Sequence, residues 1–354
     1  MNGSAMKRNP LRLIGSLLVL LIFIGAAWLL YGQLKHYDRE KILASLHAIS
    51  ISHIAGAVLL TVINYLILVG YDVLAVKYVG QKLALWRIAL ASFTGYTCSY
   101  NFGATLAGTT VRYRLYSAWN VPVFKILQLL VFLGLTFWFG VFALAGLIFV
   151  FAPLRIPEDA IVQICAELPA KANLEGPFRL LFTDSRPFGI VLLALAVFYL
   201  GMSALHRGSI RIFRWEMPVP PFRLSLYQVG IASADMLVAG AVLYVLFPTV
   251  KGGYLTVLAS YLVAYVLVVL SHVPGGWGVL EAVMIGLFDT LDLVPDAHMP
   301  HVIAALAIFR VIYFLLPLVI ALALLGAHEL ALRGGRFSKQ GRPMSDAEPE
   351  EVSR

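Results

Sequence analysis

The sequence has few charged residues and no long polar interval. Asp, Glu, Lys and Arg make up only 13% of its 354 residues, against about 25% in typical soluble domains. Hydrophobic residues reach 60%, and the mean hydropathy is +0.85. The longest polar interval, 152–187, is too short for a soluble catalytic domain of about 100–150 residues. These proportions exclude a soluble enzyme and indicate an integral membrane protein.

Residues for metal or redox chemistry are also scarce. The chain has 2 cysteines, Cys98 in an apolar segment and Cys165 in a polar loop, and no His spacing completes a metal site. The sequence contains no GxxxxGK[ST], DxD, HExxH or GxSxG motif. We therefore expect no metal, no cofactor and no enzymatic activity. The net charge of +8 is typical of basic membrane loops and requires no nucleic-acid partner.

Long apolar stretches are what the sequence does contain. A helix needs about 20 apolar residues to span a bilayer, and six stretches approach or exceed this length: 13–31, 54–74, 123–152, 188–205, 225–248 and 302–326. Two more, 88–110 and 254–288, are apolar but interrupted by polar residues or by proline and glycine. The pattern predicts an all-α polytopic membrane protein with about six to eight transmembrane helices. They would form one transmembrane domain, 13–330.

The distribution of Lys and Arg predicts the orientation of this domain. Basic clusters, which favour the cytoplasmic side, lie within 7–12, 77–87, 112–125, 207–223 and 333–342. The intervals 153–187 and 289–300 are acidic or mixed and would lie outside. We therefore expect a cytoplasmic N-terminus, 1–12, and a disordered cytoplasmic tail, 331–354. Lys35, Arg39 and Lys41 conflict with this scheme, because they fall in a loop that would lie outside.

This orientation holds only if each interrupted segment enters and leaves the membrane on the same side. The segment 88–110 would enter from the cytoplasm, and 254–288 from outside. The halves 54–152 and 225–326 would then form an inverted repeat, each with a hairpin between two helices. Transporters built in this way bind their substrate near the midplane, where broken helices meet.

The second interrupted segment contains Pro274, Gly275, Gly276 and Gly278. Proline ends a helix, and glycine permits a sharp reversal of the chain. The returning limb would begin as a helix N-terminus inside the membrane, where an anion can bind. The alternative is a tight turn with no role in binding.

The first interrupted segment is more polar. We expect its hydroxyl and amide groups to face a polar path, because facing lipid would be costly; they belong to Tyr96, Tyr100, Asn101, Thr109, Thr110 and Tyr113. Arg112 and Arg114 follow at its inner end, and a guanidinium fits a lipid phosphate in a two-pronged geometry. Alternatively, both arginines only fix the segment on the cytoplasmic side.

Three charged residues lie deep within apolar stretches: Asp235, Glu281 and Arg310. Each costs about 2.5–3.5 kcal/mol at the centre of a membrane helix, so we expect Arg310 to pair with Glu281 or Asp235. The pair would be either structural or a switch that a proton or a lipid phosphate opens. We interpret His272, just before the proline, as a packing residue.

Two motifs resemble those of a known family. GATLAGTTVRYRLY at 103–116 and SHVPGGWGVLE at 271–281 resemble the paired motifs of the lysylphosphatidylglycerol synthase transmembrane region. This region is the flippase half of the bacterial multiple peptide resistance factor and also occurs as stand-alone YbhN-like membrane proteins. The resemblance covers roughly 10–330, with Arg112 and Arg114 in the RYR element and Glu281 ending the PGGxGxxE element. Thr109, Thr110 and Asn120 depart from the family pattern and leave the substrate open.

The resemblance implies a lipid translocase of the inner membrane. The aminoacyltransferase domain of the full resistance factor has no counterpart in this sequence, so lipid aminoacylation is not implied. The partners would be membrane lipids, above all anionic phospholipids, and a lipid-modifying enzyme. Three alternatives stay open: an integral-membrane enzyme acting on lipid-linked substrates, an ion-coupled transporter of a small solute, and a non-catalytic partner of a lipid-modifying enzyme.

Overall fold

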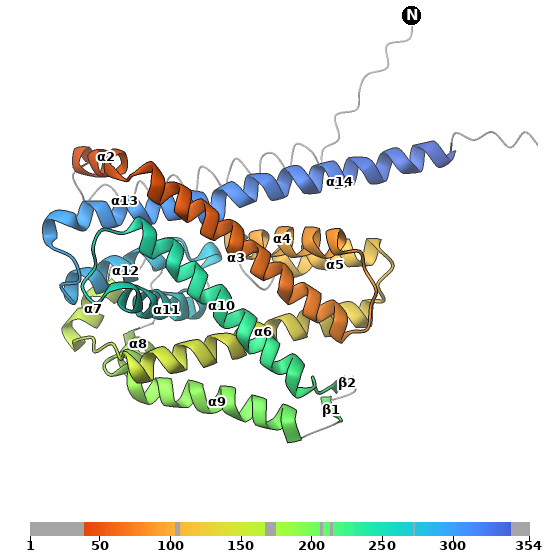
Figure 1. Ribbon diagram of the computed structural model, residues 1–354, viewed down its shortest axis with the longest axis horizontal. Helices are drawn as coiled ribbons and strands as arrows, with labels where there is room; N and C mark the ends of the chain where they lie inside the picture. The colour runs from red at the N-terminus through yellow and green to blue at the C-terminus, as the bar shows by residue number, and fades with distance from the viewer. Residues whose placement is uncertain are drawn as a thin grey trace, which may run out of the picture.

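The computed structural model describes residues 39–102, 107–166, 175–205, 208–212, 215–271 and 273–340. The described chain is nearly all helical (Figure 1). Its strands are β1 (Ser209–Ile212) and β2 (Trp215–Pro218), which pair antiparallel. It contains 6 helices that are long and apolar enough to cross a membrane. The predicted all-α polytopic membrane fold is thus confirmed, while the predicted helix at 13–31 lies outside the described residues.

The other predicted spanning stretches all form helices. They are α3 (Ile51–Tyr78), α6 (Val123–Phe151), α9 (Ser185–Leu205), α10 (Phe222–Leu246), and a continuous run of α13 (Met299–Phe309), η4 (Arg310–Leu315) and α14 (Leu316–Gln340). Helix α3 has 28 residues, which exceeds the roughly 20 needed to span a bilayer, and it crosses the bundle diagonally (Figure 1). Helix α14 continues to Gln340, so a helix covers the start of the tail that we expected to be disordered from 331.

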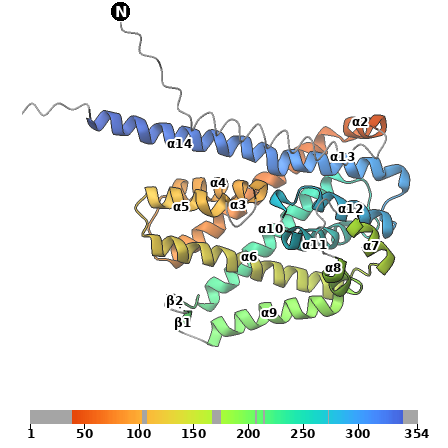
Figure 2. The ribbon, with the colours of Figure 1, turned by 180° about the vertical axis from the view of Figure 1, so that it is seen from behind.

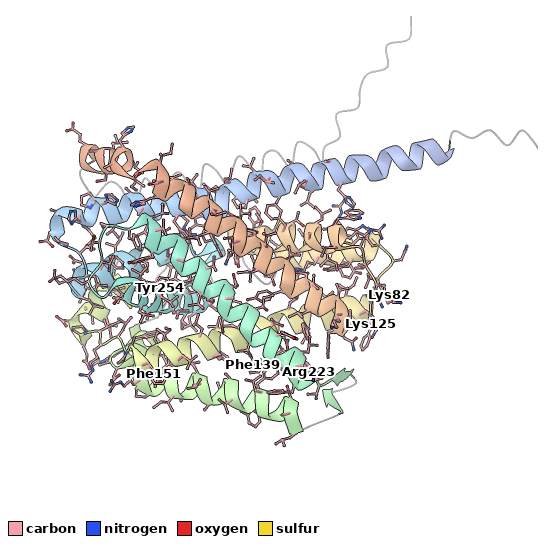
Figure 3. All side chains as sticks on the ribbon, viewed as in Figure 1. Lys82, Lys125, Phe139, Phe151, Arg223 and Tyr254 are labelled. Carbon is pink, nitrogen blue, oxygen red and sulfur yellow. The ribbon has the colours of Figure 1, made fainter. Side chains whose placement is uncertain are left out.

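Both interrupted segments fold back on themselves. Helices α4 (Leu85–Phe102) and α5 (Thr109–Ala118) pack together at the end of the bundle where Lys82, Lys125 and Arg223 lie (Figure 3). We call this the basic end. Helices α11 (Gly253–Ser271) and α12 (Val279–Thr290) also pack together, toward the opposite end of the bundle (Figures 1 and 2). The two hairpins therefore open toward opposite ends of the bundle, as the predicted inverted repeat requires, although α11 is itself one of the 6 helices long enough to cross a membrane.

The tips of the two hairpins meet inside the molecule. The last turn of α4 contacts the 3₁₀ turn η2 (Pro274–Gly276), which joins α11 to α12. Gly275 lies so close to α4 that a Cβ atom on it would stand 2.9 Å from the carbonyl oxygen of Asn101. In addition, α3 and α10, the first helices of the two halves, pack along one another. The centre of the molecule is thus built from both halves.

Short helices cover the end opposite the basic end. Helix α7 (Glu158–Ala166) packs on α12 and on α8 (Glu175–Phe182). Helix α2 (Arg39–Ala48) packs on α13, which follows the 3₁₀ turn η3 (Asp296–His298). Because α2 begins at Arg39, the conflict between its basic residues and the predicted orientation persists in the structure.

Apolar side chains fill the interior and also cover the outside. Buried Leu267, Val283 and Phe309 belong to a core around α10 to α13, and Tyr71 and Phe132 belong to a second core around α3 to α6. Large apolar side chains are also exposed on the outer helices, including Leu66, Val197 and Phe198. In water such a surface would aggregate, whereas in a bilayer it faces lipid at no cost.

Glycine at position 275 should be essential for the turn between α11 and α12. Its φ of +67° is unfavourable for any residue with a side chain, and a Cβ atom would clash with Asn101. We expect Gly275→Ala to destabilise the protein by about 1–3 kcal/mol, measured by thermal unfolding in detergent. Gly134→Ala is the matched control, because Gly134 lies in α6 with nothing within 4 Å of the added Cβ. Equal stability of the two variants would contradict the observed turn.

Candidate functional site

A buried ion pair ties the first hairpin to α3. The Nε and Nη2 atoms of Arg112 on α5 donate to the two carboxylate oxygens of Asp72, each at 3.1 Å. The hydroxyl of Tyr116 donates to the same carboxylate at 2.8 Å, and all three side chains are buried. The Cζ atom of Arg112 also lies 4.2 Å from the ring centre of Tyr96. Two nitrogens and one face of the guanidinium are therefore engaged within the protein.

Sequence reasoning missed Asp72, and this changes how Arg112 is understood. Asp72 stands near the end of the predicted span 54–74, where an acid is unremarkable, but α3 continues to Tyr78 and places it inside the fold. Arg112 was predicted to bind a lipid phosphate at the inner end of the hairpin, and its two-pronged face is instead turned to Asp72. Arg114, the second predicted phosphate ligand, is exposed on α5.

A second buried ion pair holds the turn of the other hairpin. Arg310 on η4 and Glu281 on α12 form the predicted pair, with Nη2 of Arg310 at 3.0 Å from Oε2 of Glu281. Arg310 also donates to the carbonyl oxygens of Gly275 and Gly276, at 2.7 and 2.8 Å. Those carbonyls belong to the turn, where no helix satisfies them. Arg310 thus supplies the hydrogen bonds that lipid cannot.

The sequence leaves open whether the N-terminus of α12 binds an anion or only follows a tight turn. Glu281 fills this place itself, because its Oε2 accepts a hydrogen bond from the backbone N–H of Gly278 at 2.9 Å. Gly278 has a φ of +76°, as the sharp entry into the helix requires. The helix end therefore has its own carboxylate, which is neutralised in turn by Arg310.

Asp235 on α10 is separate from this pair. Its carboxylate accepts hydrogen bonds from Nδ2 of Asn64 and from the hydroxyl of Tyr71, each at 2.9 Å. Both donors are neutral and lie on α3, and Tyr313 donates to Oδ1 of Asn64 at 2.6 Å. In the part of the chain that the structure describes, no ion pair joins Asp235 to a basic side chain. The predicted set of three midplane charges is therefore one pair and one buried acid without a cation.

A row of aromatic rings joins the two buried arginines. The ring of Tyr96, next to Arg112, lies 6.1 Å from that of Tyr100, which lies 6.0 Å from that of Phe314. Phe314 in turn lies 4.6 Å from the Cζ atom of Arg310. Tyr96 and Tyr100 are half-buried, and the ring of Tyr96 lies 5.7 Å from that of Tyr71, whose hydroxyl donates to Asp235. The centre of the molecule therefore combines aromatic faces, hydroxyl groups and a carboxylate.

The residues predicted to line a polar path divide into two groups. Tyr96, Tyr100 and Asn101 lie at the centre, and Asn101 is buried with its Oδ1 atom lacking a hydrogen-bond partner. Thr110 and Tyr113 are exposed and Thr109 is half-buried, all on α5. Residues 103–106 of the first motif and His272 lie outside the described residues. Among the residues that are described, no three His, Cys, Asp or Glu side chains come together as a metal site would require.

Two curated proteins are similar to this chain over most of their length. An uncharacterized protein of Synechocystis sp. is 36% identical over 315 residues, which are 87% of this chain and 89% of that protein. The inner membrane protein YbhN of Escherichia coli (strain K12) is 32% identical over 313 residues, 88% of this chain and 91% of that protein. No family model matches the sequence.

The pair of Arg112 and Asp72 should behave as a structural unit. Breaking a buried pair by removing one partner leaves an uncompensated charge and costs about 3–5 kcal/mol, whereas replacing both partners by apolar residues is often neutral. We therefore expect Arg112→Ala to lower the unfolding temperature in detergent strongly, and Arg112→Met with Asp72→Leu to recover most of the loss. Arg114→Ala, at an exposed position of the same helix, should change stability little. A double variant less stable than Arg112→Ala would refute the pairing.

Proposed function

This chain belongs to the family of the inner membrane protein YbhN, and from this premise we propose that it moves a polar-headed lipid between the leaflets of the inner membrane. It would be a multi-pass protein with both termini in the cytoplasm. The finer resemblance of its two motifs to the lysylphosphatidylglycerol synthase transmembrane region supports a flippase or scramblase activity. The substrate would be an anionic or zwitterionic phospholipid.

The observation that carries this proposal is Asp235, a buried acid on a membrane-spanning helix with only neutral hydrogen-bond donors. An ionisable residue in such a place is expensive, and it marks a substrate or ion pathway by default. Unlike Asp72 and Glu281, which are neutralised by arginines, Asp235 is not required to hold a hairpin in place. Its carboxylate is therefore the group best able to interact with a head group or a proton.

The surroundings of Asp235 fit a polar head group in transit. Moving such a group through hydrocarbon is costly because its polar atoms lose their hydrogen bonds to water. Tyr96 and Tyr100 would offer hydroxyl donors and aromatic faces along the row between the two hairpins. Arg112 and Arg310, although paired, would contribute fixed positive charge near a lipid phosphate, and Asp235 would attract an ammonium group. Arg114, exposed on α5, would meet phosphates at the surface.

The same observation favours one alternative. A buried acid without a cation is also what an ion-coupled transporter of a small solute would use, and such transporters share the inverted repeat. Uptake of a solute into vesicles, driven by a pH gradient and independent of lipid movement, would distinguish this activity. The lipid hypothesis takes precedence because both similar motifs come from a lipid-handling family.

Replacing the carboxylate of Asp235 should slow lipid movement without unfolding the protein. Asp235→Asn keeps the size of the side chain and removes its charge. In vesicles containing the purified protein and a fluorescent phospholipid, we expect its rate of lipid exchange between leaflets to fall at least about tenfold, a change of about 1.4 kcal/mol in the barrier.

The control is Asp292→Asn, which removes an exposed acid paired with Lys251. It should exchange lipid at the rate of the unmodified protein. The proposal fails if the unmodified protein moves no lipid, or if both variants match it while remaining folded by size-exclusion chromatography.

A further inference from the structure

Four side chains from three helices form a cluster at the base of the first hairpin. Trp86 and Arg87 lie in the first turn of α4, Trp119 follows the last residue of α5, and His328 lies on α14. The two indole rings are 6.2 Å apart in an edge-on arrangement. We call this group the Trp–Arg–His cluster. It is distinct from the two ion pairs and from Asp235.

Arg87 and His328 share the same two indole rings. The Cζ atom of Arg87 lies 5.4 Å from the ring centre of Trp86 and 5.8 Å from that of Trp119. The ring of His328 lies 6.4 and 5.9 Å from the same two rings. The guanidinium of Arg87 and the imidazole of His328 therefore both contact the same pair of indole rings.

The cluster contains nitrogen atoms without partners. Nε of Arg87 and Nε2 of His328 are both buried and have no hydrogen-bond partner. No ion pair joins Arg87 to a carboxylate anywhere in the described chain, whereas Arg112 and Arg310 each have one. A buried donor without an acceptor is unfavourable, and Arg87 as a whole is only half-buried, so a ligand can reach its guanidinium. An anion with several acceptor oxygens would offer such donors the acceptors that the described chain does not provide.

The location indicates the chemistry of that anion. The cluster joins the first turn of α4 to the end of α5, at the basic end of the bundle marked by Lys82 and Lys125 (Figure 3). Tryptophan and arginine are typical of the surface where a membrane meets water. A guanidinium fork and an imidazole together match the oxygens of a phosphate group. We propose that the Trp–Arg–His cluster binds a phosphate group, and specifically that of an anionic phospholipid at this surface.

The cluster is connected to the centre of the molecule. The ring of Trp119 lies 5.8 Å from that of Tyr116, whose hydroxyl donates to Asp72 in the first ion pair. Beyond Arg112 begins the aromatic row of Tyr96 and Tyr100. A phospholipid held at the cluster would therefore lie next to the aromatic row, and the cluster would be its first binding site during translocation. This last step rests on the proposed function, whereas binding itself does not.

The test is binding of short-chain lipid to the purified full chain in detergent. Dioctanoyl phosphatidylglycerol should raise the unfolding temperature in a saturable manner, and dioctanoyl phosphatidylcholine should do so less. We expect Arg87→Ala to weaken the apparent affinity about tenfold or more, since it removes a charge-assisted contact. Arg87→Lys keeps the positive charge but not the planar guanidinium, so its affinity for the lipid should lie between those of the unmodified protein and Arg87→Ala. Lys82→Ala removes the same charge at the same end and should change the affinity less than about twofold.

The outcomes separate the sources of the phosphate and the two proposals. Inorganic phosphate that binds as tightly as the lipid, and loses affinity in Arg87→Ala, would keep the phosphate site but refute the lipid as its ligand. Equal affinities in Arg87→Ala, Arg87→Lys and Lys82→Ala would overturn the site altogether. If Arg87→Ala does not fold, Arg87→Lys and His328→Ala decide in its place. If lipid binding depends on Arg87 while the unmodified protein moves no lipid between leaflets, the site stands and only the proposed function fails.

Discussion

The fold depends on how its membrane-embedded turns satisfy their backbone. The turn at Gly275 and Gly276 has carbonyl oxygens that no helix pairs, and hydrocarbon offers them no partner. Arg310 supplies both hydrogen bonds and is itself neutralised by Glu281, which also caps α12. A guanidinium suits this task because it presents several donors in one plane. Without this contact the carbonyl groups of the turn would have no donor inside the bundle.

The first hairpin is held by a related device that uses different residues. There the arginine lies on the hairpin and the acid on the neighbouring helix α3, whereas in the second half the acid lies on the hairpin and the arginine on the following helix. Both pairs are buried, so each hairpin is fixed to a spanning helix. Helix α10 corresponds to α3 in the repeat, but Asp235 on α10 forms no ion pair with a hairpin in the described chain, unlike Asp72 on α3. The two halves thus combine two arginine–carboxylate pairs with one buried carboxylate that only neutral donors hold.

Much of this architecture could be predicted from the sequence, because lipid imposes simple rules on it. Apolar length located five spanning segments, and basic loops required the two hairpins to fold back. The pairing of Arg310 with Glu281 followed from the cost of isolated charge. The bonding of Arg112 to Asp72, the separation of Asp235 and the Trp–Arg–His cluster did not follow, since each depends on side chains that are distant in sequence and meet only through packing. The predicted span also ended too early. Because α3 extends to Tyr78, Asp72 is buried within the bundle and not placed at its surface.

The most direct test of the account is the accessibility of residues that flank the two hairpins. Single cysteines introduced at Lys82 and Lys125, and at Lys251 and Asp292, can be labelled in intact vesicles of known orientation with a thiol reagent that does not cross membranes. Native Cys98 and Cys165 would first be replaced by serine. The account predicts that Lys82→Cys and Lys125→Cys react from one side, and that Lys251→Cys and Asp292→Cys react from the other. Labelling of Lys82→Cys and Lys125→Cys from opposite sides would contradict it.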